Sequence, residues 1–192
     1  AGVNWVDTAP SYGNGESETS LGRFGQRFSI STKVQLKQEE LADIPGEIER
    51  SLERSLKRLR RERVDVLQFH NHLGVGPRHV SVSQMLGPKG VAETLARLKA
   101  QGLIRAMGLT AAGDTAACIQ VIESGAFDTA QVYYNLLNPS AAWSRVPVPW
   151  TGQNFSGVME ACQKQHMGIL NIRVFAGGSL ASPVRHGREF VM

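Results

Sequence analysis

Cysteine is scarce in this sequence of 192 residues, which contains only Cys118 and Cys162, far apart in the chain. Two distant thiols cannot build a disulfide framework or a thiolate zinc site, so we expect reduced, partly buried thiols in a reducing compartment. No apolar run approaches the roughly 18 residues that a membrane-spanning helix needs. The N-terminus also lacks a basic region followed by a long apolar region, as in a secretory signal. These absences predict a cytoplasmic protein with no membrane partner.

An excess of one charge is also missing, because 21 basic residues face 17 acidic ones and leave a net charge of +4. The one dense basic stretch, Lys57–Arg63, is interrupted by Glu62 and carries Leu59 within it. We interpret it as the solvated C-terminal end of a helix, where cations are favoured, and expect no nucleic-acid partner. An apolar share of 42% is typical of a globular protein that buries a sizeable core.

Short apolar runs alternate with longer helical stretches along the whole chain. The runs are bounded by turn residues, which is typical of strands buried on both faces. The expected strands are Asn4–Val6, Phe28–Thr32, Asp65–Phe69, Ile104–Leu109, Thr129–Tyr133 and Gly168–Val174. Strictly alternating strands and helices predict parallel strands joined by right-handed crossovers. Both a doubly wound sheet and a (β/α) barrel satisfy this pattern.

The helical stretches between these strands have recognisable ends and faces. In the clearest one, Pro45–Arg61, apolar residues recur every three or four positions, and Asp43 is a plausible cap before it. The other expected helices are Ser17–Arg23, Val91–Ala100, Asp114–Ser124 and Asn154–Gln165. Two long segments, Asn71–Gly90 and Asn138–Gln153, are expected to be loops.

The number of units points to an incomplete barrel. Eight β/α units take about 250 residues, or roughly 30 per unit, and the six strands here match that spacing. We therefore predict the α/β class, a (β/α)8 TIM-barrel type with about six of its eight units, in one partial domain over residues 1–192. The chain begins inside an element without an initiator Met, so we expect it to be a fragment. Unpaired edges of such a barrel would favour self-association.

Polar residues end three successive strands of this pattern. Asp7, Lys33 and His70 each follow an apolar run, and Tyr12 comes five positions after Asp7 in the segment DTAPSYG. In parallel α/β folds the carboxyl ends of the strands face the active site. An acid, a phenol, an amine and an imidazole are therefore expected to meet at one end of the sheet.

Several segments resemble the aldo-keto reductase family. GVNWVDTAPSYGNGESETSLGR is similar to the family signature over its second strand and the following helix, and ISTKV and VDVLQFHN are similar to the strands that supply its lysine and histidine. GLIRAMGLT and AQVYYNLLN resemble its fifth and sixth strands. The resemblance implies a (β/α)8 barrel that reduces carbonyls with a nicotinamide cofactor and no metal. It gives Asp7, Tyr12, Lys33 and His70 the roles of the catalytic tetrad.

Elementary chemistry is consistent with these roles. Hydride addition to a carbonyl leaves an alkoxide that needs a proton, and a free phenol releases a proton reluctantly near neutral pH. An ammonium beside Tyr12 would stabilise its phenolate, and this is the role expected for Lys33. Asp7 would hold Lys33 charged and aimed, and His70 would donate a hydrogen bond to the carbonyl oxygen.

The resemblance also implies a set of cofactor contacts, with NADP(H) or else NAD(H) as the cofactor. Gln131 matches the family glutamine that holds the nicotinamide amide, and Thr110 keeps a hydroxyl where the family has a serine. Ala111 replaces the family asparagine, so one amide contact is missing. Arg173 takes the place of an aromatic residue, and its planar guanidinium can also stack on a ring. No G-x-G-x-x-G segment follows a strand, which argues against a Rossmann site.

The function expected from these residues is oxidoreduction of a small-molecule carbonyl or sugar, in either direction, with Tyr12 as general acid or base. Two alternatives remain. The chain could keep the pocket but serve regulation or assembly, or it could be a metal-dependent hydrolase on the same barrel. His70 and His72 suggest metal ligands, but a usable site needs at least three, so we predict no metal.

Overall fold

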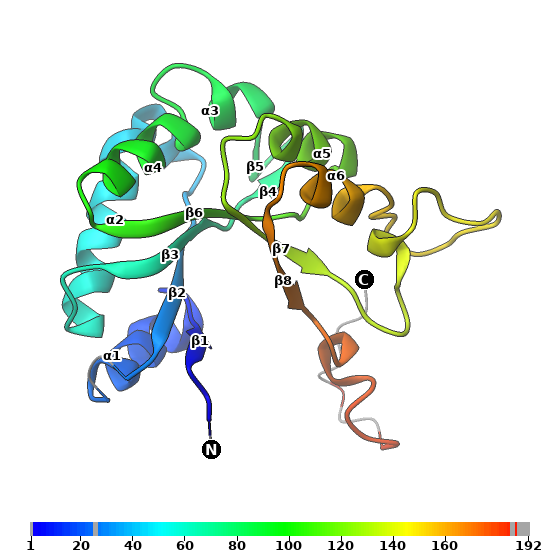
Figure 1. Ribbon diagram of the computed structural model, residues 1–192, viewed down its shortest axis with the longest axis horizontal. Coiled ribbons are helices and arrows are strands. Elements are labelled where there is room, and N and C mark those ends of the chain that lie inside the picture. The colour runs from blue at the N-terminus through cyan, green and yellow to red at the C-terminus, as the bar shows by residue number, and fades with distance from the viewer. Residues whose placement is uncertain (1, 25–26, 185–186, 188–192) are drawn as a thin grey trace.

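The computed structural model describes residues 2–24, 27–184 and 187. Six parallel strands form one sheet in the order β1-β2-β3-β6-β7-β8, and the sheet curls with β1 and β8 at its two ends (Figure 1). The strands are Trp5–Asp7 (β1), Ser29–Val34 (β2), Val64–Phe69 (β3), Ile104–Thr110 (β6), Thr129–Tyr133 (β7) and Gly168–Ile172 (β8). The expected α/β fold of barrel type with six units is confirmed. Each strand lies within two residues of its predicted bounds.

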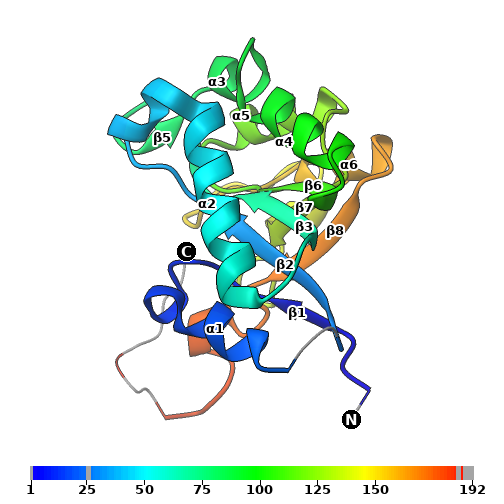
Figure 2. The same cartoon turned by 90° about the vertical axis from the view of Figure 1, so that its left-hand side faces the viewer.

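Helices follow the strands and cover the outer side of the curled sheet. On this side α2 lies beside β2 and above α1 (Figure 2). The α-helices are Glu16–Gly22 (α1), Ile44–Leu59 (α2), Val82–Leu86 (α3), Val91–Ala100 (α4), Thr115–Glu123 (α5) and Val158–Lys164 (α6). Short 3-10 turns occupy Tyr12–Gly15 (η1), Glu39–Asp43 (η2), Ser140–Ala142 (η3) and Ala176–Gly178 (η4). The five predicted helices are confirmed, with α6 beginning later than expected.

Alternation along the strands separates the apolar core from a polar inner face. Ile30, Leu67 and Leu109 are completely buried and belong to the core cluster that the helices share with the sheet. On the opposite face, Gln68 donates a hydrogen bond to the Ser31 hydroxyl across the β2–β3 pair at 2.6 Å. Because neighbouring residues of a strand point to opposite faces, one side of the sheet is apolar and the other carries functional groups.

Helix α2 begins within one residue of its predicted start and ends at Leu59, two residues before its predicted end. The Asp43 side chain caps it by accepting a hydrogen bond from the Gly46 amide at 3.1 Å, and Pro45 lies in the first turn. Arg60 ends it in the left-handed conformation with φ at 54°. Ile48 and Leu52 lie on the apolar face of the helix and are buried in the core.

Two predictions made from the sequence are corrected by the fold. The segment Asn71–Gly90 is not a plain loop, because it holds the two-residue strands His72–Leu73 (β4) and His79–Val80 (β5) as well as α3. Strands this short have no periodicity to read, whereas α3 has a detectable capping box of Ser81 and Gln84.

The basic run Lys57–Arg63, which begins in the last turn of α2, is not fully exposed to solvent. The carboxylate of the fully buried Glu18 accepts hydrogen bonds from Arg58 at 2.7 Å and from the Thr32 hydroxyl at 2.6 Å. Arg61 donates to the Phe28 carbonyl at 2.9 Å. The expectation of a solvated helix end is therefore wrong for these two arginines, which tie α2 to α1 and β2.

The strands β1 and β8 form the two outer edges of the sheet, through which self-association was predicted. Within residues 2–24, 27–184 and 187, no strand pairs with the free side of β1 or of β8. Trp5 on β1 and Phe175 just beyond β8 are exposed large apolar side chains. Association through these edges stays a prediction.

Close packing of α1 on α2 depends on a glycine. A Cβ atom on Gly22 would lie 2.3 Å from the Arg58 carbonyl oxygen, so Gly22→Ala must push the helices apart. We expect this variant to lower the free energy of unfolding by about 1–3 kcal/mol, as overpacking does. Urea unfolding followed by circular dichroism measures the effect. Ser20→Ala on the same helix is the control, with a change within about 0.5 kcal/mol. Equal stability of the two variants would contradict the close contact.

Candidate active site

The carboxyl ends of the strands bring the predicted polar residues to one edge of the sheet. Asp7 is the last residue of β1, Lys33 is the penultimate residue of β2, and His70 follows β3 directly. The His70 amide still continues the parallel ladder by donating to the Val34 carbonyl at 2.8 Å. Three adjacent strands thus present three different functional groups side by side.

Lys33 is the most constrained of these residues, since its side chain is only 1% exposed. Its ammonium lies 2.5 Å from Asp7 Oδ2 and donates a second hydrogen bond to the Thr8 carbonyl at 2.8 Å. A buried ammonium is tolerated only where it is paired and hydrogen-bonded. Thr8 was not foreseen as a site residue, because a backbone carbonyl leaves no signal in the side-chain pattern.

Tyr12 meets Lys33 from the turn that follows β1. The Lys33 ammonium lies over the Tyr12 ring, 4.8 Å from its centroid, and the tyrosine is 42% exposed. The turn is set by Gly13 and Asn14, whose φ angles of 59° and 53° lie in the left-handed region that glycine and asparagine adopt readily. The phenol is therefore held beside the cation with one side open to solvent.

His70 is electrically neutral at pH 7. Burial, together with the charge of Lys33, lowers its pKa to about 4. Its Nδ1 atom is buried and has no hydrogen-bond partner. A neutral imidazole carries one N–H donor and one acceptor nitrogen, so His70 can donate a hydrogen bond without holding a positive charge.

Thr110 and Gln131 also reach this site, from β6 and β7. The two residues face each other across the strand pair, and the Thr110 hydroxyl donates to Gln131 Oε1 at 3.2 Å. Gln131 Nε2 donates in turn to Asp7 Oδ1 at 2.8 Å. The link to Asp7 was not foreseen, because it joins residues that are 124 positions apart in the sequence.

Arg173 stands further from this group in the strand order. It follows β8 with an exposed side chain, a φ angle of 58° and a backbone carbonyl that accepts a hydrogen bond from Asn135. β8 pairs with β7, so Arg173 comes one strand beyond Gln131.

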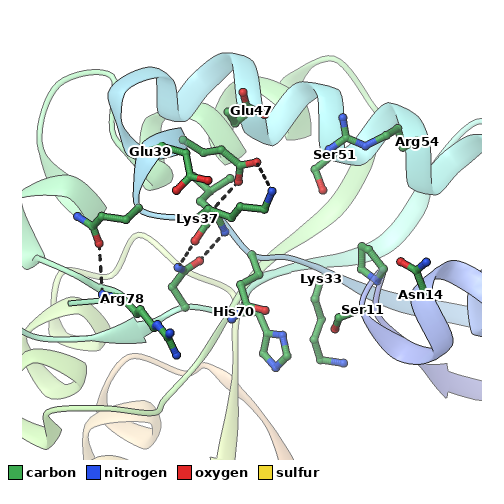
Figure 3. Close-up of a pocket in the computed structure, with 16 residues that line it drawn as sticks. Ser11, Asn14, Lys33, Lys37, Glu39, Glu47, Ser51, Arg54, His70 and Arg78 are labelled. Atoms are coloured by element: carbon green, nitrogen blue, oxygen red, sulfur yellow. Dashed lines mark hydrogen bonds and ion pairs between the residues drawn. The ribbon is translucent and has the colours of Figure 1, made fainter. Parts of the chain in front are cut away.

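A cavity of about 660 Å³ adjoins Lys33 and His70 at the end of β2. Figure 3 shows these two side chains pointing the same way from their adjacent strands, with Lys37, Arg54 and Arg78 around the rest of the cavity. Asn71 shapes its wall by exchanging two hydrogen bonds with the Leu36 backbone, at 2.8 and 2.7 Å. The three outer cations have no motif in the sequence that could have identified them.

Metal binding and thiol chemistry have less support in the described residues. Among residues 2–24, 27–184 and 187, no three His, Cys, Asp or Glu side chains are grouped to hold a metal ion. His72 belongs to β4 and lies 5.9 Å from the His79 ring, ring centre to ring centre. Burial raises the pKa of Cys118 to about 12 and that of Cys162 to about 11, so both thiols stay protonated at neutral pH.

No helix in the described residues is long and apolar enough to cross a membrane.

Comparison with known proteins identifies relatives over almost the whole chain. The model of the Aldo/keto reductase family matches residues 1–190. A D-threo-aldose 1-dehydrogenase from a Pseudomonas species is 28% identical, with 98% of this chain and 61% of that protein covered. The chain thus spans about three fifths of this curated relative.

Solved structures agree with the family match. A protein from Pseudomonas aeruginosa assigned to the aldo-keto reductases is 30% identical and superposes with a TM-score of 0.67 over 93% of this chain and 61% of its own. An aldo-keto reductase from Klebsiella pneumoniae in complex with NADPH has the same fold, with a TM-score of 0.68 at 21% identity over 97% of this chain and 57% of its own. Because the family model matches residues 1–190, the chain belongs to the aldo/keto reductase family.

Proposed function

We propose that this chain carries the catalytic side of an NADP(H)-dependent oxidoreductase that interconverts a small carbonyl compound and its alcohol. The observation that supports this most directly is the buried Lys33–Asp7 pair beside the Tyr12 ring. The same three residues were predicted as catalytic from the sequence. Family membership and the aldose dehydrogenase relative are consistent with the proposal.

The residues available for a cofactor fit the amide of a nicotinamide. After its bonds to Asp7 and Thr110, Gln131 retains one N–H and one acceptor site, which match the acceptor and donor of a primary carboxamide. Thr110, Gln131 and Arg173 are the residues that would hold the ring, without the amide that Ala111 cannot supply. When bound, the cofactor would supply or accept the hydride. The Klebsiella relative, which is a complex with NADPH, supports this choice.

Tyr12 would donate the proton that the reduced oxygen needs. Its phenol is open to solvent and borders the Lys33 ammonium, which stabilises negative charge left on the ring oxygen. Asp7 would keep Lys33 charged and in place, since a buried ammonium without its partner is strongly disfavoured. In the oxidative direction the same phenol would accept the proton.

His70 would orient the substrate through a hydrogen bond. Its low pKa of about 4 keeps it neutral, so it can polarise a carbonyl oxygen without competing with Tyr12 as a proton source. Besides charged side chains, the cavity beside it is lined by the neutral amides of Gln35 and Gln38. Such groups suit a hydroxylated substrate, and the aldose dehydrogenase relative agrees with a sugar.

The first test removes the proposed proton donor. Tyr12→Phe deletes only the phenol oxygen and leaves the ring beside Lys33, so turnover with a test aldehyde and NADPH should fall at least about 10²-fold. Loss of absorbance at 340 nm measures turnover, and NADPH titration should show nearly unchanged binding. Tyr134→Phe, at another exposed tyrosine, is the control. Full activity of Tyr12→Phe would overturn the proposal, and an inactive wild-type protein would favour the non-catalytic alternative.

The neutral state of His70 predicts a pH dependence of stability. The folded-state pKa of about 4 lies below the ordinary 6.5, so the unfolded chain binds more protons between these values. The free energy of unfolding should therefore fall as pH drops from 6.5 towards 4, by at most about 3 kcal/mol through this residue. Urea unfolding at a series of pH values should show this slope reduced in His70→Gln.

The exposed His166 provides the matched control, because asparagine also accepts its φ angle of 53°. His166→Asn should keep the wild-type slope. A His70→Gln slope identical to that of the wild-type protein would mean that His70 takes up its proton at an ordinary pH.

A further inference from the structure

A continuous chain of hydrogen bonds crosses the inner face of the sheet from β6 to β2. The Thr110 hydroxyl donates to Gln131 Oε1 at 3.2 Å, and Gln131 Nε2 donates to Asp7 Oδ1 at 2.8 Å. The other oxygen of Asp7 accepts from Lys33 at 2.5 Å. The residues expected to contact the cofactor are thus connected to the residues expected to move the proton.

The orientation of the Gln131 amide follows from its partners. The side chain is 2% exposed, so it has almost no access to bulk water. The Asp7 carboxylate can only accept, so it takes the N–H end of the amide, and the oxygen end is left to accept from the Thr110 hydroxyl. Asp7 therefore selects one of the two amide orientations, and the Thr110 hydroxyl can bond the end that remains.

Among these hydrogen-bonded residues, Asp7 is the one whose side chain is held least firmly by burial. Its side chain is 34% exposed, whereas that of Lys33 is 1% exposed. A carboxylate bound only through Oδ2 could rotate towards solvent, and the bond from Gln131 to Oδ1 fixes its second oxygen. The direction of the Lys33 ammonium, and with it the contact to the Tyr12 ring, depends on where that carboxylate lies.

We propose that Gln131 is a positioning residue for the proton-transfer site, in addition to its expected contact with the nicotinamide amide. It holds Asp7 so that Lys33 stays directed at Tyr12. This inference rests on the proposed function. A primary carboxamide that binds the remaining donor and acceptor of Gln131 would contact the same side chain that holds Asp7. Occupancy of the cofactor site and the position of the Asp7 carboxylate are therefore linked.

A simple cofactor contact and a positioning role make different predictions for Gln131→Met. Loss of a contact alone raises the NADPH concentration needed for half-saturation and leaves the pH profile of saturated turnover unchanged. Loss of positioning lowers saturated turnover itself, because the proton donor is no longer aligned.

The experiment measures kcat against pH at saturating NADPH for the wild-type protein and Gln131→Met. We expect kcat to fall at least about 10-fold and the limb of the profile governed by the proton donor to move by about half a pH unit or more. Gln68→Met is the matched control, since Gln68 is a fully buried, inward-facing amide that bonds Ser31 and not Asp7. Its pH profile should coincide with that of the wild-type protein. Coinciding profiles for Gln131→Met at saturation would overturn the inference.

A second measurement does not require activity. Gln131 and Lys33 bond the two different oxygens of Asp7, so an effect of one on the other must pass through this carboxylate. We expect the urea midpoint shift of the double variant Gln131→Met, Lys33→Met to differ from the sum of the single shifts. Additive shifts would overturn the inference. A wild-type protein without reductase activity would refute the proposed function, while this cycle would still decide whether Gln131 is coupled to Lys33.

Discussion

Burial of the Lys33 ammonium is the constraint on which the site depends. A charge that is 1% exposed must find partners, and here they come from the end of β1, through the Asp7 carboxylate and the Thr8 carbonyl. These bonds join β1 to β2 at the edge of the sheet where Tyr12 enters its turn. The electrostatic requirement of one side chain thereby fixes the relative position of a strand, a turn and the phenol that the turn carries.

A second buried charge supports the arrangement from the other side of the sheet. Thr32 and Lys33 are neighbours in β2, so their side chains point to opposite faces. Thr32 bonds the buried Glu18 of α1, which Arg58 of α2 neutralises. Since α1 follows directly after the turn of Tyr12, this outer cluster anchors the helix that ends that turn. Two buried ionic groups on opposite faces of one strand thus hold the same loop.

Alternation and spacing made most of the fold predictable, because each strand is a short apolar run and each helix has a cap or an apolar face. The meeting of Asp7, Lys33 and His70 was also predictable, since parallel strands place their carboxyl ends together. The bond of Gln131 to Asp7 was not, because it depends on how strongly the sheet curls. The two-residue strands β4 and β5 were equally hidden, since their pairing depends on tertiary contacts.

The division of roles between His70 and Lys33 follows from their proximity. Two cations in one partly buried site repel each other, so the group that loses its proton more readily becomes neutral. An ammonium ordinarily holds its proton to far higher pH than an imidazole. Lys33 also has the carboxylate of Asp7 beside it, whereas His70 Nδ1 has no partner. Burial is the main reason why the imidazole is uncharged; the charge of Lys33 lowers the His70 pKa further, whereas the Asp7 carboxylate acts in the opposite direction. The part of Asp7 is to hold in place the cation that lies beside both Tyr12 and His70.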